Sequence, residues 1–203
     1  MSRLLLKAVA VLATAITFAG GAQAATCGNN AGGFEAWKRE FAAEAQRAGV
    51  GQRGIQALMN ASYSTSTIAA DRNQKGVKYS LNDFIRIRLG SVDGFAKTGR
   101  GRVQRNPQFY AAIEQRYGVP AGILVSIHGM ETGFGRTMGN VPVVSSISTV
   151  AYDCRRSSFF TPHALAALQM VDRGMLAPNQ KGAAHGELGH TQFLPGNALR
   201  YGV

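Results

Sequence analysis

An apolar segment with one carboxylate near its end occupies residues 117–135, and few local structures suit it. Pro120 fits the first position of a helix, because its missing N–H would have no hydrogen-bond partner there. Gly133 can adopt the left-handed conformation that ends a helix. The segment therefore predicts a helix of about three turns, with Glu131 in its last turn.

Helical spacing places Glu131 on the same side as three less polar residues. Leu124, Ile127 and His128 precede it by seven, four and three positions. An apolar stripe of this kind normally faces the protein interior, so we expect the carboxyl to be buried. Burial favours the protonated form that a general acid requires. The alternative is a glutamate at a helix end that neighbouring backbone N–H groups satisfy.

Helical spacing of apolar residues recurs along most of the chain, and no segment shows sustained strand alternation. Residues 144–152 are rich in β-branched side chains and could form a strand, but we interpret them as the start of a helix. The predicted fold class is mainly α. The predicted helices cover residues 34–48, 52–60, 81–89, 107–116, 120–132, 144–154 and 158–173.

Two connections separate these helices. Residues 62–80 are rich in Ser, Thr, Asn and Lys and are interpreted as a polar linker. Residues 90–106 contain several glycines and the densest group of basic residues, and we expect a loop there. Over residues 107–117 we expect Phe109 and Tyr117 to point inward, and in the helix over residues 34–48 we expect Lys38 to lie outside the apolar stripe.

The N-terminus has the features of a secretory signal peptide over residues 1–24. Arg3 and Lys7 precede an apolar run over residues 8–19, and small residues at 22–24 suit cleavage. We therefore expect an exported, periplasmic protein whose mature chain starts at Ala25. An uncleaved membrane anchor is the alternative, and a lipid anchor on Cys27 is less expected.

The sequence contains two cysteines, Cys27 and Cys154. Export would place them in an oxidising compartment, where they could form a disulfide. The bond would tie an N-terminal extension, residues 25–33, to the body of the protein. Closing so long a loop contributes roughly 4–5 kcal/mol in the chain-entropy description. Two buried free thiols are the alternative.

The chain is strongly basic, with a net charge of +11 that falls to +9 once Arg3 and Lys7 leave with the signal peptide. Such a surface favours an anionic polymer, whether cell-wall glycan with acidic peptides, a membrane surface or nucleic acid. The length of 203 residues and a hydrophobic content of 45% suit one domain with a sizeable core. Charge alone does not choose among these partners.

Four motifs in register resemble the lytic murein transglycosylases of the type-B group. They are residues 117–120, 129–135, 151–156 and 186–195. The resemblance covers residues 34–203 and implies a lysozyme-like, mostly helical transglycosylase domain with a cleft for glycan strands. It favours peptidoglycan over nucleic acid as the partner, leaves contact with a cell-wall or membrane surface open, and implies no cofactor.

The resemblance also implies roles for individual residues. Glu131 would be the only catalytic acid and base, cleaving the β-1,4 bond between N-acetylmuramic acid and N-acetylglucosamine and leaving a 1,6-anhydromuramyl end. Gln192 would contact substrate, and Arg155 and Arg156 would bind peptide carboxylates. For Gln192 the alternative is an amide that stabilises a turn. For Arg155 and Arg156 the alternative is that they are ordinary surface arginines.

The residues alone also permit other chemistry. Glycoside hydrolases usually need a second carboxylate, and Asp153 or Glu187 could supply it, so a muramidase-type hydrolase stays open. Histidines and glutamates near residues 128 and 185–190 are potential zinc ligands. Their spacing differs from that of a zincin helix, and we expect no metal.

Three positions depart from the family pattern. His128 stands where the family tends to carry an aromatic residue, and a protonated imidazole there would tune the acidity of Glu131. Ala183 replaces a serine. The chain stops at Val203, so we expect the C-terminal part of the catalytic domain to be missing. An inactive peptidoglycan-binding remnant is the alternative to an active enzyme.

Overall fold

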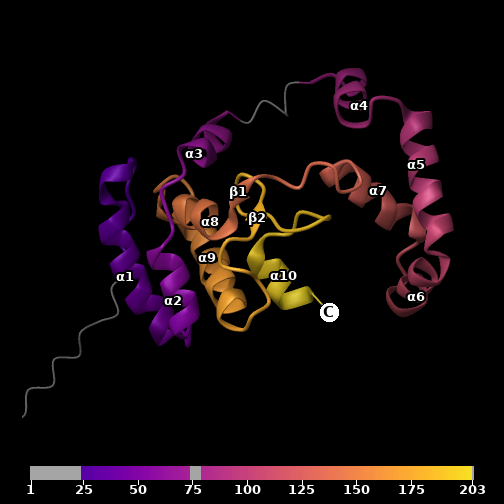
Figure 1. Ribbon diagram of the computed structural model, residues 1–203. Coiled ribbons are helices and arrows are strands. Elements are labelled where there is room, and N and C mark those ends of the chain that lie inside the picture. The colour runs from indigo at the N-terminus through magenta and orange to yellow at the C-terminus, as the bar shows by residue number, and fades with distance from the viewer. Residues whose placement is uncertain (1–23, 74–78, 203) are drawn as a thin grey trace, which may run out of the picture.

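The computed structural model describes residues 24–73 and 79–202 and is mainly helical, as predicted (Figure 1). The predicted signal peptide lies almost entirely outside these residues. The elements are η1 (Ala31–Gly33), α1 (Phe34–Arg47), α2 (Gln52–Met59), α3 (Thr65–Arg72), α4 (Leu81–Leu89), α5 (Val92–Arg105), α6 (Pro107–Tyr117), α7 (Ala121–Thr132), β1 (Val141–Pro142), α8 (Val143–Tyr152), α9 (Ser157–Asp172), β2 (Lys181–Gly182) and α10 (Pro195–Tyr201).

The main core is built from α1, α2, α8 and α9. Phe34, Trp37 and Phe41 stack along α1, and Tyr152 at the end of α8 packs against the first two. Residues 143–152 are helical, so the strand alternative was wrong for this segment. Nearly the whole of α8 is buried, which explains why its sequence has no charged residue.

Lys38 is buried, contrary to the prediction that it lies outside the apolar stripe. Its side chain is 3% exposed, and Nζ donates hydrogen bonds to the backbone carbonyls of Met59 and Ala61 at 2.8 and 2.7 Å. Nζ also pairs with Glu35 at 3.0 Å. The ammonium group therefore satisfies carbonyls at the C-terminal end of α2, where the helix dipole favours a cation.

A second, smaller group contains α4, α5 and α6, with α7 between it and the main group (Figure 1). Its core consists of Tyr110, Val125 and Phe134. The predicted inward positions in α6 were wrong, because Phe109 is 60% exposed and Tyr117 50%. Tyr110 takes the buried position instead.

Two segments expected to be irregular are helices. Ser64 caps α3 by accepting a hydrogen bond from the Thr67 N–H, and Ser91 caps α5 in the same way from the Gly94 N–H. Gly99 is the buried residue of α5, and a Cβ atom there would lie 3.5 Å from Val125, an ordinary contact distance. The helix therefore forms in spite of the propensity cost of about 1 kcal/mol for a glycine inside a helix.

A short antiparallel pair, β1 with β2, positions the segment that follows it. Val141 lies opposite Gly182, and Pro142 opposite Lys181. The chain from Gly182 to α10 then forms a loop that carries the fourth sequence motif. This loop returns toward the end of α7.

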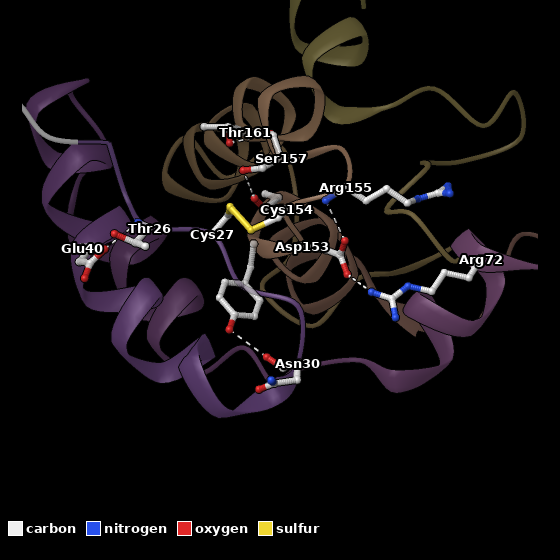
Figure 2. The surroundings of a disulfide bond; sticks show 12 residues. Thr26, Cys27, Asn30, Glu40, Arg72, Asp153, Cys154, Arg155, Ser157 and Thr161 are labelled. Atoms are coloured by element: carbon white, nitrogen blue, oxygen red, sulfur yellow. Dashed lines mark hydrogen bonds and ion pairs between the residues drawn. A yellow bond between two sulfur atoms is a disulfide. The ribbon is translucent and has the colours of Figure 1, made fainter.

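The N-terminal extension is held against the end of α8 (Figure 2). Cys27 and Cys154 form a disulfide, as expected from the sequence. Gly28 donates to the Tyr152 carbonyl at 3.0 Å and accepts from the Cys154 N–H at 3.1 Å. A Cβ atom on Gly28 would lie 2.0 Å from the Tyr152 hydroxyl, so only glycine fits there.

Among the residues that the structure describes, no helix has both the length and the apolar character needed to cross a membrane.

Candidate functional site

Glu131 lies in the last turn of α7, and its side chain is exposed. The predicted burial of this carboxyl was therefore wrong. The buried residues of α7 are Val125, Gly129 and Thr132, which form a different stripe. Gly129 allows close approach to α5, since a Cβ atom would lie 2.5 Å from the Phe95 ring.

The end of α7 is shaped by the motif that carries Glu131. Gly133 adopts the predicted left-handed conformation, with φ +57°, and its N–H donates to the Gly129 carbonyl at 2.9 Å. Pro120 is the N-cap residue, one position earlier than predicted. In residues 24–73 and 79–202, Glu131 forms no ion pair and no side-chain hydrogen bond, so its carboxyl is available to a ligand.

Thr132 connects the end of α7 to the loop that contains Gln192. Its side chain is fully buried, and Oγ1 donates to the His190 carbonyl at 2.9 Å and accepts from the Gly135 N–H at 3.0 Å. Glu131 and Gln192 are therefore held on two segments that touch through their sequence neighbours. No sequence signal singled out Thr132, although it lies within the motif of residues 129–135.

Gln192 has a positive φ of +53°, which is unusual for a residue other than glycine. Its side-chain amide donates to the Gly189 carbonyl at 2.8 Å and so closes the turn over residues 189–192. Gln192 therefore stabilises a turn, which was the alternative to a substrate contact for this residue. The side-chain carbonyl oxygen makes no hydrogen bond within the part of the chain described, so it can still accept one from a ligand.

His128 contacts His190, and no ion pair with Glu131 is formed within the described residues. The two imidazoles approach at 2.8 Å between His128 Nε2 and His190 Nδ1. Burial, His190 and Arg102 together lower the pKa of His128. The rings border a cavity of about 530 Å³ whose other walls include Arg102, Phe109 and Leu124.

Arg155 and Arg156 converge on Asp71, which belongs to α3. Arg155 donates from Nε to the carboxylate and from Nη2 to the backbone carbonyl, both at 2.9 Å, and Arg156 pairs with the other carboxylate oxygen. The Asp71 side chain is 4% exposed, whereas those of Arg155 and Arg156 are 45% and 33% exposed. No hydrogen bond among described residues joins the two arginines to Glu131 or Gln192.

The two acidic residues that could have served as a second carboxylate are already paired. Asp153 is 3% exposed. One carboxylate oxygen accepts from the Arg72 side chain at 2.7 Å, and the other accepts from the backbone N–H of Arg155 at 3.0 Å (Figure 2). Glu187 contacts His185 at 3.2 Å. Burial alone raises the pKa of Glu187, but hydrogen bonds from His185 and from backbone N–H groups outweigh burial and lower it.

The potential metal ligands do not gather in one place. His185 lies between Glu187 and Asp71, at 3.5 Å from the latter, whereas His128 and His190 meet elsewhere at 2.8 Å. Within residues 24–73 and 79–202, no group of three or more His, Cys, Asp or Glu side chains could hold a metal ion.

Asp71 organises the arginine pair, so its charge should matter for stability. We expect Asp71→Asn to lower the free energy of unfolding by about 2 kcal/mol, because the buried carboxylate that accepts charge-assisted hydrogen bonds from Arg155 and Arg156 becomes a neutral amide. Urea denaturation would measure the change. Glu114→Gln, which neutralises an exposed carboxylate on α6, is the matched control. An unchanged urea midpoint in Asp71→Asn would contradict this role.

Comparison with known proteins identifies the family. A family profile for the transglycosylase SLT domain matches residues 33–203. Membrane-bound lytic murein transglycosylase B of Escherichia coli K12 is 35% identical over 91 residues, which are 44% of this chain and 25% of that protein. The matched part of this chain thus spans only about a quarter of the length of this curated relative.

Solved structures support the same assignment. SltB3 from Pseudomonas aeruginosa, crystallised with NAG-NAM-pentapeptide, superposes with a TM-score of 0.77 at 28% identity, covering 84% of this chain and 46% of that one. Soluble lytic transglycosylase SltB1 from the same organism gives 0.72 at 27% identity, covering 82% and 57%. The chain belongs to the transglycosylase SLT domain family.

Proposed function

We propose that this protein is a peptidoglycan lytic transglycosylase that cleaves the β-1,4 bond between N-acetylmuramic acid and N-acetylglucosamine. Family membership supports the reaction class, and the complex of SltB3 with NAG-NAM-pentapeptide supports a glycan strand with peptides as substrate. Glu131 is the acid and base of the reaction.

The mechanism uses one carboxyl group twice. Protonated Glu131 gives its proton to the glycosidic oxygen, and the bond from that oxygen to C1 of N-acetylmuramic acid breaks. The carboxylate then takes the proton of the C6 hydroxyl while O6 bonds to C1, which leaves a 1,6-anhydro end. No water is consumed, and Glu131 ends the cycle protonated. Attack from within the same sugar makes a second protein carboxylate unnecessary.

The observation that carries the proposal is the difference between Glu131 and its acidic neighbours in the sequence motifs. Glu131 is exposed and has no partner among the described residues, whereas Asp153 and Glu187 are engaged by Arg72 and His185. A hydrolase would need one of these paired groups to activate water. Among the described residues of the four motifs, Glu131 is the one carboxylate without a partner, which favours the transglycosylase reaction over the muramidase alternative.

Because Glu131 is exposed in the free chain, we expect the bound glycan to remove water from it. Desolvation by a sugar ring favours the protonated carboxyl, the form that can give a proton to the leaving group. The burial predicted from the sequence would then be supplied by the substrate and not by the protein. Gln192, through its unused side-chain carbonyl, would accept a hydrogen bond from the same sugar chain.

Arg155 and Arg156 are proposed to bind the carboxylates of the stem peptides. Both side chains are partly exposed, and Nη1 of each makes no hydrogen bond within the described residues. Asp71 holds the inner side of both guanidiniums, which leaves their outer nitrogens for a ligand. Paired guanidiniums suit planar carboxylates.

We further propose that the protein acts in the periplasm after export. The Arg3 and Lys7 leader pattern and the disulfide between Cys27 and Cys154 both support an exported protein. The basic net charge supports contact with an anionic cell wall or membrane surface. The proposal includes neither a cofactor nor nucleic acid.

Digestion of purified peptidoglycan in water enriched in oxygen-18 tests the reaction type. A lytic transglycosylase should release muropeptides that contain no heavy oxygen at the new end and that are one water lighter than hydrolytic products. Mass spectrometry of the products measures both, and a lysozyme digest in the same water is the control that takes up the label. Labelled, hydrated ends from this protein would show hydrolysis, and binding without release would support a binding remnant.

A further inference from the structure

The pair of imidazoles at the end of α7 has no role in the reaction proposed above. His128 lies one turn before Glu131, and its Nε2 is 2.8 Å from Nδ1 of His190. The ring planes are nearly perpendicular, at 87°. The geometry suits a hydrogen bond in which one ring donates and the other accepts.

His190 belongs to a turn that is closed on itself. Leu188 donates from its N–H to the Phe193 carbonyl at 2.8 Å, and Gln192 closes the turn through its amide to Gly189. The turn therefore moves as one unit, and whatever fixes His190 also fixes Gln192.

Two hydrogen bonds join this turn to α7 within the described residues. One is the bond from Thr132 to the His190 carbonyl, and the other is the imidazole pair. The His190 ring also packs on Gly135, where a Cβ atom would lie 2.4 Å from Cε1. Only the imidazole pair depends on protonation.

We propose that His128 and His190 form a clasp that positions the Gln192 turn against the Glu131 helix and opens when both imidazoles become protonated. Both histidines are positioning residues, since they act through the turn. The effect on catalysis rests on the proposed transglycosylase function, whereas the clasp itself does not.

Proton counting explains why the clasp opens in acid. When the pair is neutral or carries one added proton, one of the two facing nitrogens has no N–H and still accepts the hydrogen bond. With two, both nitrogens carry N–H groups that face each other at hydrogen-bond distance, and the rings repel. The pair therefore binds protons in two coupled steps, of which the second is the unfavourable one.

The surroundings of the pair oppose the second proton. Arg102 reaches the same cavity from α5, Tyr110 lines it from α6, and Glu131 follows His128 on its own helix but is exposed. Burial, His190 and Arg102 lower the pKa of His128. Because the folded pKa lies below the unfolded value, the clasp is complete above about pH 6.5 and is lost as the pH falls through the folded pKa.

Two substitutions of His190 distinguish the contact between the two segments from its dependence on protonation. His190→Asn places an amide near the position of Nδ1 and does not titrate, so the clasp should persist at all pH values. His190→Ala removes the contact. His163→Asn is the control, since the pKa of His163 is also lowered by burial but its ring bonds to Gly196 at the start of α10.

Hydrogen exchange and histidine NMR provide a readout that does not need activity. In the wild type and in His163→Asn, we expect two-step titration of His128, and protection of the Leu188 amide, which donates to the Phe193 carbonyl, about tenfold lower at pH 5 than at pH 7.5, the equivalent of one ordinary hydrogen bond. His190→Asn should keep its protection at both pH values, and His190→Ala should lack it at both.

Product release from peptidoglycan at the same two pH values completes the test. The rate for His190→Asn relative to wild type should rise about tenfold on going from pH 7.5 to pH 5. Independent titration of the two rings, or amide protection that does not change with pH in the wild type, would overturn the clasp. A wild type that shows the clasp by NMR but releases nothing would overturn the proposed function alone.

Discussion

Glu131→Gln is expected to reduce release of anhydromuropeptides by at least about a thousandfold. General acid and base catalysis contributes about 10²–10⁴-fold when a single group is removed, and here one group performs both proton transfers. An amide has nearly the same size as the carboxyl but can neither give the first proton nor take the second. The measurement is the initial rate of product release from purified peptidoglycan, followed by mass spectrometry.

The same variant should fold normally, which makes the loss interpretable. Glu131 is exposed and has no ion pair or side-chain hydrogen bond in the described residues, so thermal unfolding should match that of the wild type. Glu114→Gln makes the same chemical change on α6 and should retain activity. A Glu131→Gln protein that still releases anhydro products would show that another group serves as the acid.

The position of Glu131 was predictable, but its exposure was not. Proline and glycine at the two ends gave the bounds of α7 to within one residue. The helix is apolar on every side, so spacing alone could not show which stripe packs inward. That choice is made by α5, which approaches α7 at Gly129 and leaves Ile127 and Glu131 facing outward.

The arginine pair illustrates a second limit of local patterns. Arg155 and Arg156 were selected by a motif, but the residue that orients them, Asp71, lies 84 positions from Arg155. Asp71 falls in a segment that its polar composition assigned to a linker. A capping serine at Ser64 was the available signal for the helix, and Thr67 and Asp71 at helical spacing marked its buried face.

The His128 and His190 pair shows the same limit with a functional consequence. Each histidine was noticed as a separate potential ligand, but 62 positions separate them along the chain. Only the return of the loop after β2 toward the end of α7 places the rings together. Contacts between distant segments therefore account for most of what the sequence did not predict at the site.

Removal of the disulfide is expected to have the largest effect on stability. Cys27 and Cys154 are 127 positions apart, and closing such a loop contributes about 5 kcal/mol in the chain-entropy description, with about 2–5 kcal/mol typical on removal. We expect the double variant Cys27→Ser, Cys154→Ser to lose about 4 kcal/mol in urea denaturation. Since a domain of this kind is only about 5–15 kcal/mol stable, the variant should unfold well below the wild-type urea midpoint.

The effect should also appear without mutation, because a reductant opens the same bond in the wild type. Urea denaturation of the wild type with and without dithiothreitol should then give the same difference, and the double variant should not respond to the reductant. An equal midpoint for oxidised and reduced protein would mean that backbone bonds at Gly28 and the Tyr152 contact hold the N-terminal extension by themselves. The extension packs on α1 and α8, at the opposite side of the molecule from α4, α5 and α6 (Figure 1). We therefore expect the double variant to keep its catalytic activity at urea concentrations below its unfolding transition.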